Sequence, residues 1–192
     1  MKNIIKDFKT GELKDTRFVH PVRITYTQNS KNKVWEAVKS FDSVSVLLYH
    51  EEKDAFLLVK QFRAPVYLNN KNHLCTYELC AGIIDKDASL EQITKEEIDE
   101  ECGYDVPLDS IKKITSFYTN VGVSGGCQNL FYATINESMK VHNGGGINDE
   151  EIDLMFLPLD EIEEFLFDET KAKTPGLMFS FYWFMKKRRG CK

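Results

Sequence analysis

The chain of 192 residues lacks several features that mark other classes of protein. No apolar run approaches the length that crosses a membrane, and the charged N-terminal segment is not typical of a secretion signal. Lysines and arginines form no stripe before the basic residues 186–189, and the net charge is −5, so nucleic acid is not expected as the main partner. Without internal repeats or low-complexity linkers, the chain is expected to form one or two soluble globular units.

The cysteines also exclude a class of site. There are five of them, an odd number, and no two form a C-x-x-C pair. The four histidines do not approach any cysteine at the spacing of zinc ligands, so no zinc site is expected. Reduced and mostly buried thiols explain this pattern best, which predicts a cytoplasmic protein.

Strand patterns dominate the chain, and helices are inserted between them. Alternating or continuous apolar segments predict strands at 17–28, 34–41, 43–50, 56–62, 76–82, 111–119, 129–135 and 152–159. Turns are expected at 29–33, 51–54 and 69–72, and helices at 160–167 and 174–187, where Pro175 suits a first helical turn. This order indicates a β-hairpin unit followed by a mixed sheet flanked by helices.

One segment, residues 81–105, concentrates negative charge. It holds nine carboxylates and only two lysines. Ser89 is a good N-cap with Gln92 three residues on, as in a capping box, and Gly103 is a typical C-terminal stop. The pattern therefore predicts a helix over 90–102.

A helical wheel places part of this charge on the buried side. At about 100° per residue, Glu97 and Glu101 lie between the apolar side chains, with Glu100 beside them. Like charges at i,i+4 repel, carboxylates oppose the dipole at a helix C-terminus, and a buried carboxylate requires a partner or a proton. A hard divalent cation, Mg²⁺ or Mn²⁺, removes all three penalties. A merely solvated acidic helix is the alternative, and it does not explain acids on the apolar stripe.

The segment resembles the Nudix box, G-x5-E-x7-R-E-U-x-E-E-x-G-U, where U is a bulky apolar residue. Gly82 opens it, and the far end is in register at Glu97, Ile98, Glu100, Glu101, Gly103 and Tyr104. The stretches "DSVSVLLY", "LLVKQFRAPV", "YELCAGIID" and "NVGVSGGCQNLFYAT", with an acidic loop before "LMFLPLDE", resemble the branch that hydrolyses nucleoside diphosphate sugars. The resemblance covers residues 17–164.

Two positions depart from that pattern. Ala88 stands where the box has its first glutamate, and Glu96 where it has arginine. In the family these positions form a salt bridge that braces the loop against the helix. Because both halves are replaced, and such a bridge is worth about 0–1 kcal/mol, the brace is expected to be dispensable here.

The resemblance also implies roles beyond the helix. Glu97 and Glu101 are the primary expected metal ligands, with Glu100 as a third, and the resemblance adds the backbone carbonyl of Ala81. It places the base for the attacking water, or a further metal ligand, on the loop 144–154. Glu150 is the first choice there, Asp149 and Glu151 are the alternatives, and Glu100 and Glu101 also count as catalytic candidates.

Substrate contacts are expected from four further residues. Arg63 offers a bidentate guanidinium to a phosphate, although an exposed ion pair is the alternative. Glu78 is expected to ligate metal or to brace Arg63. Gly122 and Ser124 lie in a glycine-containing loop that allows close backbone approach, as does any ordinary turn. Tyr26, Phe18 or Trp35 offers a ring for a nucleobase, but core packing is favoured for each.

The resemblance implies an α+β fold, a Nudix α/β/α sandwich with a mixed sheet, preceded by an N-terminal antiparallel β-hairpin. Residues 1–40 would form a hairpin unit that dimerises, because an isolated ribbon is marginal in water, and 41–192 the hydrolase domain. The predicted activity is Mg²⁺-dependent hydrolysis of a UDP-glucose-like nucleotide sugar to a nucleoside monophosphate and a sugar phosphate. Three alternatives remain: an ADP-ribose pyrophosphatase, a non-catalytic nucleotide sensor, and a triphosphatase for damaged nucleotides.

Overall fold

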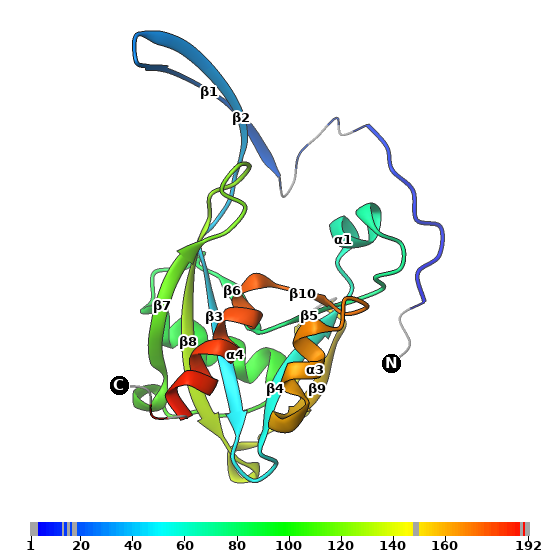
Figure 1. The fold of residues 1–192 in the computed structure, drawn as a ribbon, viewed down its shortest axis with the longest axis vertical. Coiled ribbons are helices and arrows are strands. Elements are labelled where there is room, and N and C mark those ends of the chain that lie inside the picture. The colour runs from blue at the N-terminus through cyan, green and yellow to red at the C-terminus, as the bar shows by residue number, and fades with distance from the viewer. Residues whose placement is uncertain are drawn as a thin grey trace.

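A mixed sheet between helices forms the body of the molecule, and a hairpin projects from it (Figure 1). The structure is a computed structural model that describes residues 4–12, 14, 16, 19–147, 150–188 and 190. The sheet has eight strands in the order β10-β5-β4-β3-β8-β7, with β6 paired to β3 and β9 paired to β4. The β3–β8 and β10–β5 pairs are parallel and the other pairs are antiparallel. The expected mixed sheet flanked by helices is confirmed.

The elements follow the chain in a β-rich order. The strands are β1 His20–Gln28, β2 Lys31–Lys39, β3 Ser43–His50, β4 Ala55–Gln61, β5 Thr76–Glu78, β6 Cys80–Ile83, β7 Lys112–Tyr118, β8 Cys127–Ile135, β9 Ile152–Pro158 and β10 Ala172–Lys173. The α-helices are α1 Ala64–Asn69, α2 Leu90–Glu97, α3 Ile162–Phe167 and α4 Pro175–Arg188, and short 3₁₀ turns cover Leu108–Ser110, Glu137–Met139 and Leu159–Glu161. Across the described ranges, every helix is too short or too polar to cross a membrane.

Both faces of the central strands are buried, which explains their continuous apolar sequences. On β3, Val44 and Val46 point into a cluster shared with Ile93 of α2. Leu47, which follows Val46 along β3, points to the opposite face and into a second cluster with Phe181 of α4. The sheet therefore separates a core under α2 from a core under α3 and α4, which lie on the opposite face (Figure 1).

The single strand expected at 76–82 is wrong, because the segment forms two strands with different partners. Residues of β5 pair with β4, whereas β6 pairs with β3. Leu79 lies at the crossover and is buried. A local apolar pattern cannot reveal this change of partner. It matters because it brings Glu78 and Ala81 to the place where β3 and β4 separate.

The N-terminal hairpin is confirmed, with a tighter turn than expected. The predicted turn at 29–33 contracts to Asn29 and Ser30, whose φ angles of 53° and 60° suit a two-residue turn that matches strand twist. The hairpin extends away from the body (Figure 1). Its inner end is held by Trp35 Nε1, which donates to Gly122 O at 3.0 Å, and by Val38 N, which donates to Val123 O at 2.8 Å.

Candidate active site

The acidic segment forms the predicted helix, with half of the predicted capping box. Ser89 Oγ accepts a hydrogen bond from Gln92 N at 3.1 Å. The reciprocal bond is replaced, because Gln92 Nε2 donates to Glu96 Oε1 at 2.8 Å. Gly103 ends the helix with a φ of 78°, and a Cβ there would overlap the carbonyl of His142. Glycine is therefore required on both conformational and steric grounds.

The helix is not regular throughout, which corrects the expectation of one α-helix over 90–102. It is α-helical over Leu90–Glu97 and continues as a π-helical turn over Ile98–Cys102. Such wider turns are rare and occur frequently at functional sites. The turn keeps Glu101 inward, where only 5% of it is exposed, while Glu97 and Glu100 are partly buried. The predicted inward direction of Glu97 and Glu101 is thus observed.

Neither inward carboxylate forms a salt bridge within the described residues. Glu101 Oε2 accepts a hydrogen bond from Ala81 N at 3.0 Å, yet burial raises the pKa of Glu101 to about 8. Burial, followed by repulsion from Glu100 and Glu150, raises the pKa of Glu97 to about 7. Carboxyl groups in this state gain from an added cation.

Gly82 makes room for Glu97. A Cβ added at Gly82 would overlap the Glu97 carboxylate, so this side chain lies directly against the backbone of β6. The close approach explains why a glycine opens the acidic segment.

The donor chemistry of the cluster fits a hard divalent cation, because carboxylate and carbonyl oxygens are the ligands that Mg²⁺ prefers. Buried carboxylates with raised pKa values point the same way. In the part of the chain that the structure describes, however, no three His, Cys, Asp or Glu side chains are grouped as metal ligands. Binding by several of these carboxylates therefore requires side-chain movement.

The loop before β9 is joined to the acidic helix. Gly145 N donates to Glu101 O at 2.8 Å, and Gly146 N donates to Glu100 O at 3.2 Å. Gly144, Gly145 and Gly146 all have positive φ angles, of 63°, 111° and 85°. These bonds bring Glu150 close enough to raise the pKa values of Glu97 and Glu101. Glu150 Oε2 accepts a hydrogen bond from Ile147 N at 3.1 Å.

Of the alternatives to Glu150 on this loop, Glu151 is exposed and directly precedes β9, and Asp149 lies outside the described residues. The structure therefore brings Glu150 to the acidic cluster, as its place on the loop suggested. The choice of the base itself stays a prediction.

Arg63 and Glu78 form a bidentate pair. Arg63 Nε donates to Glu78 Oε1 at 2.8 Å and Nη2 donates to Oε2 at 2.9 Å, while Thr76 Oγ1 also donates to Oε1. Although burial opposes it, this bonding lowers the pKa of Glu78. Glu78 thus braces Arg63, one of the two roles expected for it. The Arg63 side chain remains 47% exposed and accessible to an anion.

The loop that contains Gly122 and Ser124 contacts the N-terminal hairpin. Gly122 O accepts from Trp35, and a Cβ at Gly122 would meet nothing within 4 Å, so no close approach requires glycine there. Ser124 N donates to Asn120 O at 3.0 Å within the loop. Their expected role as substrate contacts stays a prediction.

The expectation that the hairpin aromatics pack in a core is wrong for two of them. Tyr26 is 42% exposed and Trp35 is 52% exposed, because neither strand of the hairpin is covered by another layer. Phe18 lies outside the described residues.

The loop before α2 is braced by an ion pair other than the one in the family pattern. Lys86 Nζ forms an ion pair with Glu96, which Gln92 supports from one turn before. The bridge links the loop before α2 to the helix with the charges exchanged: the cation stands on the loop and the carboxylate on the helix. Sequence reasoning missed it because Lys86 lies two residues before the position at which the family carries its glutamate.

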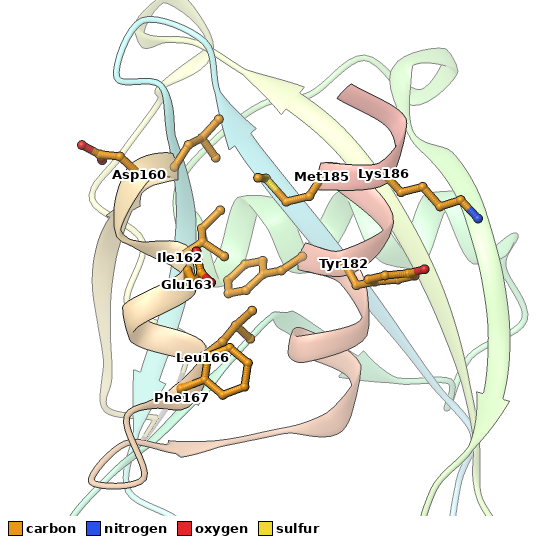
Figure 2. A pocket seen from close by; sticks show the side chains of 10 residues that line it. Asp160, Ile162, Glu163, Leu166, Phe167, Tyr182, Met185 and Lys186 are labelled. Carbon is orange, nitrogen blue, oxygen red and sulfur yellow. The ribbon is translucent and has the colours of Figure 1, made fainter. Parts of the chain in front are cut away.

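A cavity between α3 and α4 does not reach the acidic segment, whereas a cavity at the start of α4 does. A cavity of about 650 Å³ between α3 and α4 is lined mainly by apolar side chains, with Asp160, Glu163 and Lys186 at its edges (Figure 2). No residue of 81–105 lines it. A second cavity, of about 600 Å³, includes Glu78 and Ala81. The second cavity is the one that can serve chemistry at the acidic helix.

The fold of this chain is shared with a protein of known structure. The structure matches a "Crystal structure of ADP compounds hydrolase" with a TM-score of 0.70, over 92% of this chain and 90% of that chain. The sequence identity is 14%, so the match concerns the fold alone.

Sequence relatives identify the family. The chain is 31% identical to uridine diphosphate glucose pyrophosphatase NUDT14 of Bos taurus, in an alignment of 208 positions that covers 94% of each chain. It is 31% identical to the GDP-mannose pyrophosphatase of Citrobacter koseri over 166 residues, covering 84% of this chain and 85% of the relative. No family model matches the sequence. The chain belongs to the Nudix hydrolase superfamily, in its nucleoside diphosphate sugar pyrophosphatase branch.

Proposed function

We propose that this protein is a Mg²⁺-dependent hydrolase of nucleoside diphosphate sugars, with UDP-glucose as the first candidate substrate and Mn²⁺ as an alternative metal. The products would be a nucleoside monophosphate and a sugar phosphate. The observation that carries the proposal is the pair of inward carboxylates, Glu97 and Glu101, which have raised pKa values and lie near Arg63 and the loop of Glu150. The similarity to a UDP-glucose pyrophosphatase along 94% of the chain supports the substrate class.

Glu97, Glu100 and Glu101, together with the carbonyl of Ala81 and the carboxylate of Glu150, would hold the cation. When bound, the cation neutralises the diphosphate and polarises a phosphorus atom for attack. Loss of the Glu101 proton is part of binding, because a carboxylate must be ionised to ligate a metal. The raised pKa values of Glu97 and Glu101 make metal uptake stronger as the pH rises through 7 and 8.

The remaining groups act on the substrate and on water. Arg63, held by Glu78, presents its exposed edge to a phosphate oxygen. Glu150 accepts the proton of the attacking water, and the glycines that precede it allow the loop to adjust. Since Glu150 is bonded to Ile147 N, its carboxylate must leave that donor when it acts.

The hairpin supports a homodimer in which residues 1–40 form the contact unit. Nearly every residue of β1 and β2 is exposed, including Val22, Ile24 and Val34. A two-stranded ribbon with apolar residues on the surface gains stability by packing on a second copy. Light scattering coupled to gel filtration tests this, and a monomer at micromolar concentration would reject it. The free thiols at Cys75, Cys80, Cys102 and Cys127 support a reducing, cytoplasmic setting.

A substrate panel tests the proposal. UDP-glucose, GDP-mannose and ADP-ribose are incubated with the protein and Mg²⁺, with and without chelator, and the products are identified. UDP-glucose is expected to give UMP and glucose 1-phosphate, and only when the metal is free. A clear preference for ADP-ribose would overturn the choice of substrate. Binding of nucleotide sugars without any turnover would favour a sensor instead.

A further inference from the structure

The second cavity, which we call the Ser45 cavity, extends from Ala81 on β6 to the start of α4. Its lining includes Ser45, Glu78, Ala81, Phe117, Gln128 and Gly176. Ser45 pairs with Ala81 in the β3–β6 ladder. Ala81 N in turn donates to Glu101. One end of the cavity therefore lies a single strand away from the proposed diphosphate site.

Ser45 is a buried hydroxyl without a partner. The residue is 1% exposed, and within the described residues its Oγ has no hydrogen-bond partner. Because every second residue of a strand points to the same face, Ser45 shares its face of β3 with Leu47, which belongs to the core under α4. An unsatisfied buried polar group is destabilising, so its presence in a cavity wall points to a ligand that completes it.

Gln128 provides a second polar group. Its Nε2 donates weakly to Ser43 Oγ at 3.5 Å, and no donor to its Oε1 occurs in the described part of the chain. A Cβ added at Gly176 would lie 2.9 Å from Gln128 Oε1 and 3.0 Å from Phe117 Cζ. Because Gly176 has no Cβ, the Gln128 carboxamide and the Phe117 ring can pack against the start of α4.

The charges in the wall of the cavity are already engaged. Glu78 is paired with Arg63, and Lys173 Nζ donates to the backbone carbonyls of Asp168 and Lys171. The groups that remain free include the Ser45 hydroxyl and the Gln128 amide oxygen, beside the Phe117 ring. These suit a neutral group with several hydroxyls, and not a phosphate. The exposed rings of Tyr26 and Trp35 offer a separate surface for a nucleobase.

We propose that the Ser45 cavity binds the sugar of the nucleotide sugar, with sugar hydroxyls bonded to Ser45 Oγ and Gln128 Oε1. This inference rests on the proposed function, because that function supplies the sugar next to the diphosphate. It assigns Ser45 and Gln128 a part in choosing between sugars, which the acidic helix and Arg63 do not have.

The test measures binding of products, so it does not depend on turnover. Glucose 1-phosphate, mannose 1-phosphate and UMP are titrated calorimetrically, with Mg²⁺, into the wild-type protein and the variants Ser45→Ala and Gln128→Leu. Each variant is expected to bind the preferred sugar phosphate about 3- to 10-fold more weakly, as for one lost hydrogen bond, with UMP unchanged. Ser45→Ala should keep the wild-type melting temperature, because no internal hydrogen bond is lost.

Ser180→Ala is the matched control. Ser180 is also a buried serine, on the inner face of α4, but its Oγ donates to Leu177 O at 2.7 Å and it does not line the cavity. Its substitution should lower the melting temperature and leave sugar phosphate binding unchanged. A fall in melting temperature for Ser45→Ala equal to that of this control would indicate a structural role and overturn the inference.

Other outcomes also decide the matter. The inference is overturned if both cavity variants bind sugar phosphate as the wild type does, if they lose affinity only for UMP, or if they lose affinity equally for sugar phosphate and UMP. It is also overturned if the wild type binds neither sugar phosphate. Failure of the proposed function is distinct: the wild type would then hydrolyse no nucleotide sugar in the panel, whatever the variants bind.

Discussion

Lys86 and Glu96 join the loop before α2 to the helix by an ion pair whose polarity is the reverse of the family's bridge. The side chains are 45% and 35% exposed, so the pair contributes little stability. Its position is more informative than its energy, since Glu96 directly precedes the proposed ligand Glu97 and the loop directly follows β6, the strand that contains Gly82. The bridge fixes the loop and the start of the carboxylate cluster relative to each other.

Charge exchange tests this bridge. Lys86→Glu alone sets two carboxylates against each other and is expected to lower the melting temperature by no more than about 2–4 °C and to reduce kcat/KM. The double variant Lys86→Glu with Glu96→Lys restores an attractive pair and should recover most of both losses. If the double variant were as impaired as the sum of the two single variants, the bridge would have no positioning role.

Stability of the metal-free protein should depend on pH through Glu97 and Glu101. Their pKa values in the folded protein, about 7 and about 8, exceed the ordinary value of 4.5, so the unfolded chain releases these protons first. The raised pKa values of Glu97 and Glu101 therefore lower the free energy of unfolding above about pH 4.5, and this loss grows as the pH rises toward 8. Melting temperatures from pH 5 to 9 should fall more steeply for the wild type than for Glu97→Gln with Glu101→Gln. Parallel curves would contradict the raised pKa values.

Gly82 should be intolerant of even one methyl group. Gly82→Ala places a Cβ where the Glu97 carboxylate lies, so this side chain must move away from β6. We expect a loss of Mg²⁺-dependent activity of roughly 10-fold or more, the size seen when groups that orient a metal site are disturbed. Gly11→Ala is the control, because a Cβ at Gly11 meets nothing within 4 Å. Equal activity of the two variants would show that the position of Glu97 is unimportant.

Arg63 should not be replaceable by lysine. Lysine keeps the charge but cannot form the two parallel bonds to Glu78, so Arg63→Lys loses the fixed direction of the guanidinium. The expected result is a fall in kcat/KM of about 10-fold or more at nearly unchanged melting temperature. Arg188→Lys, at an exposed pair with Asp54, provides the comparison and should behave as the wild type. A normal kcat/KM for Arg63→Lys would remove Arg63 from the site.

Local signals predicted the parts of the fold that local chemistry determines. The apolar run of β3 gave its bounds directly, and Ser89 and Gly103 delimited the acidic helix because capping depends on a few neighbouring atoms. The inward direction of Glu97 and Glu101 followed from helical periodicity, although the π-helical turn at Ile98–Cys102 left no mark in that pattern.

Features that depend on distant partners were not predictable in the same way. The division of 76–82 into β5 and β6 arises because β4 and β3 each take one half, and neither partner is encoded locally. The bridge from Lys86 to Glu96 spans ten residues and a loop whose course the sequence does not give. The Ser45 cavity joins β3, β6, β8 and α4, so only the assembled sheet reveals it.

Magnesium binding by the carboxylate cluster is tested most directly by calorimetric titration of the metal into the protein at pH 8.5, without substrate. The account predicts saturable uptake by the wild type, and uptake weakened more than about 100-fold in Glu101→Gln, which keeps the size of the side chain and its acceptor oxygen for Ala81 N. The same Mg²⁺ affinity in Glu101→Gln as in the wild type, or no uptake by the wild type, would contradict it.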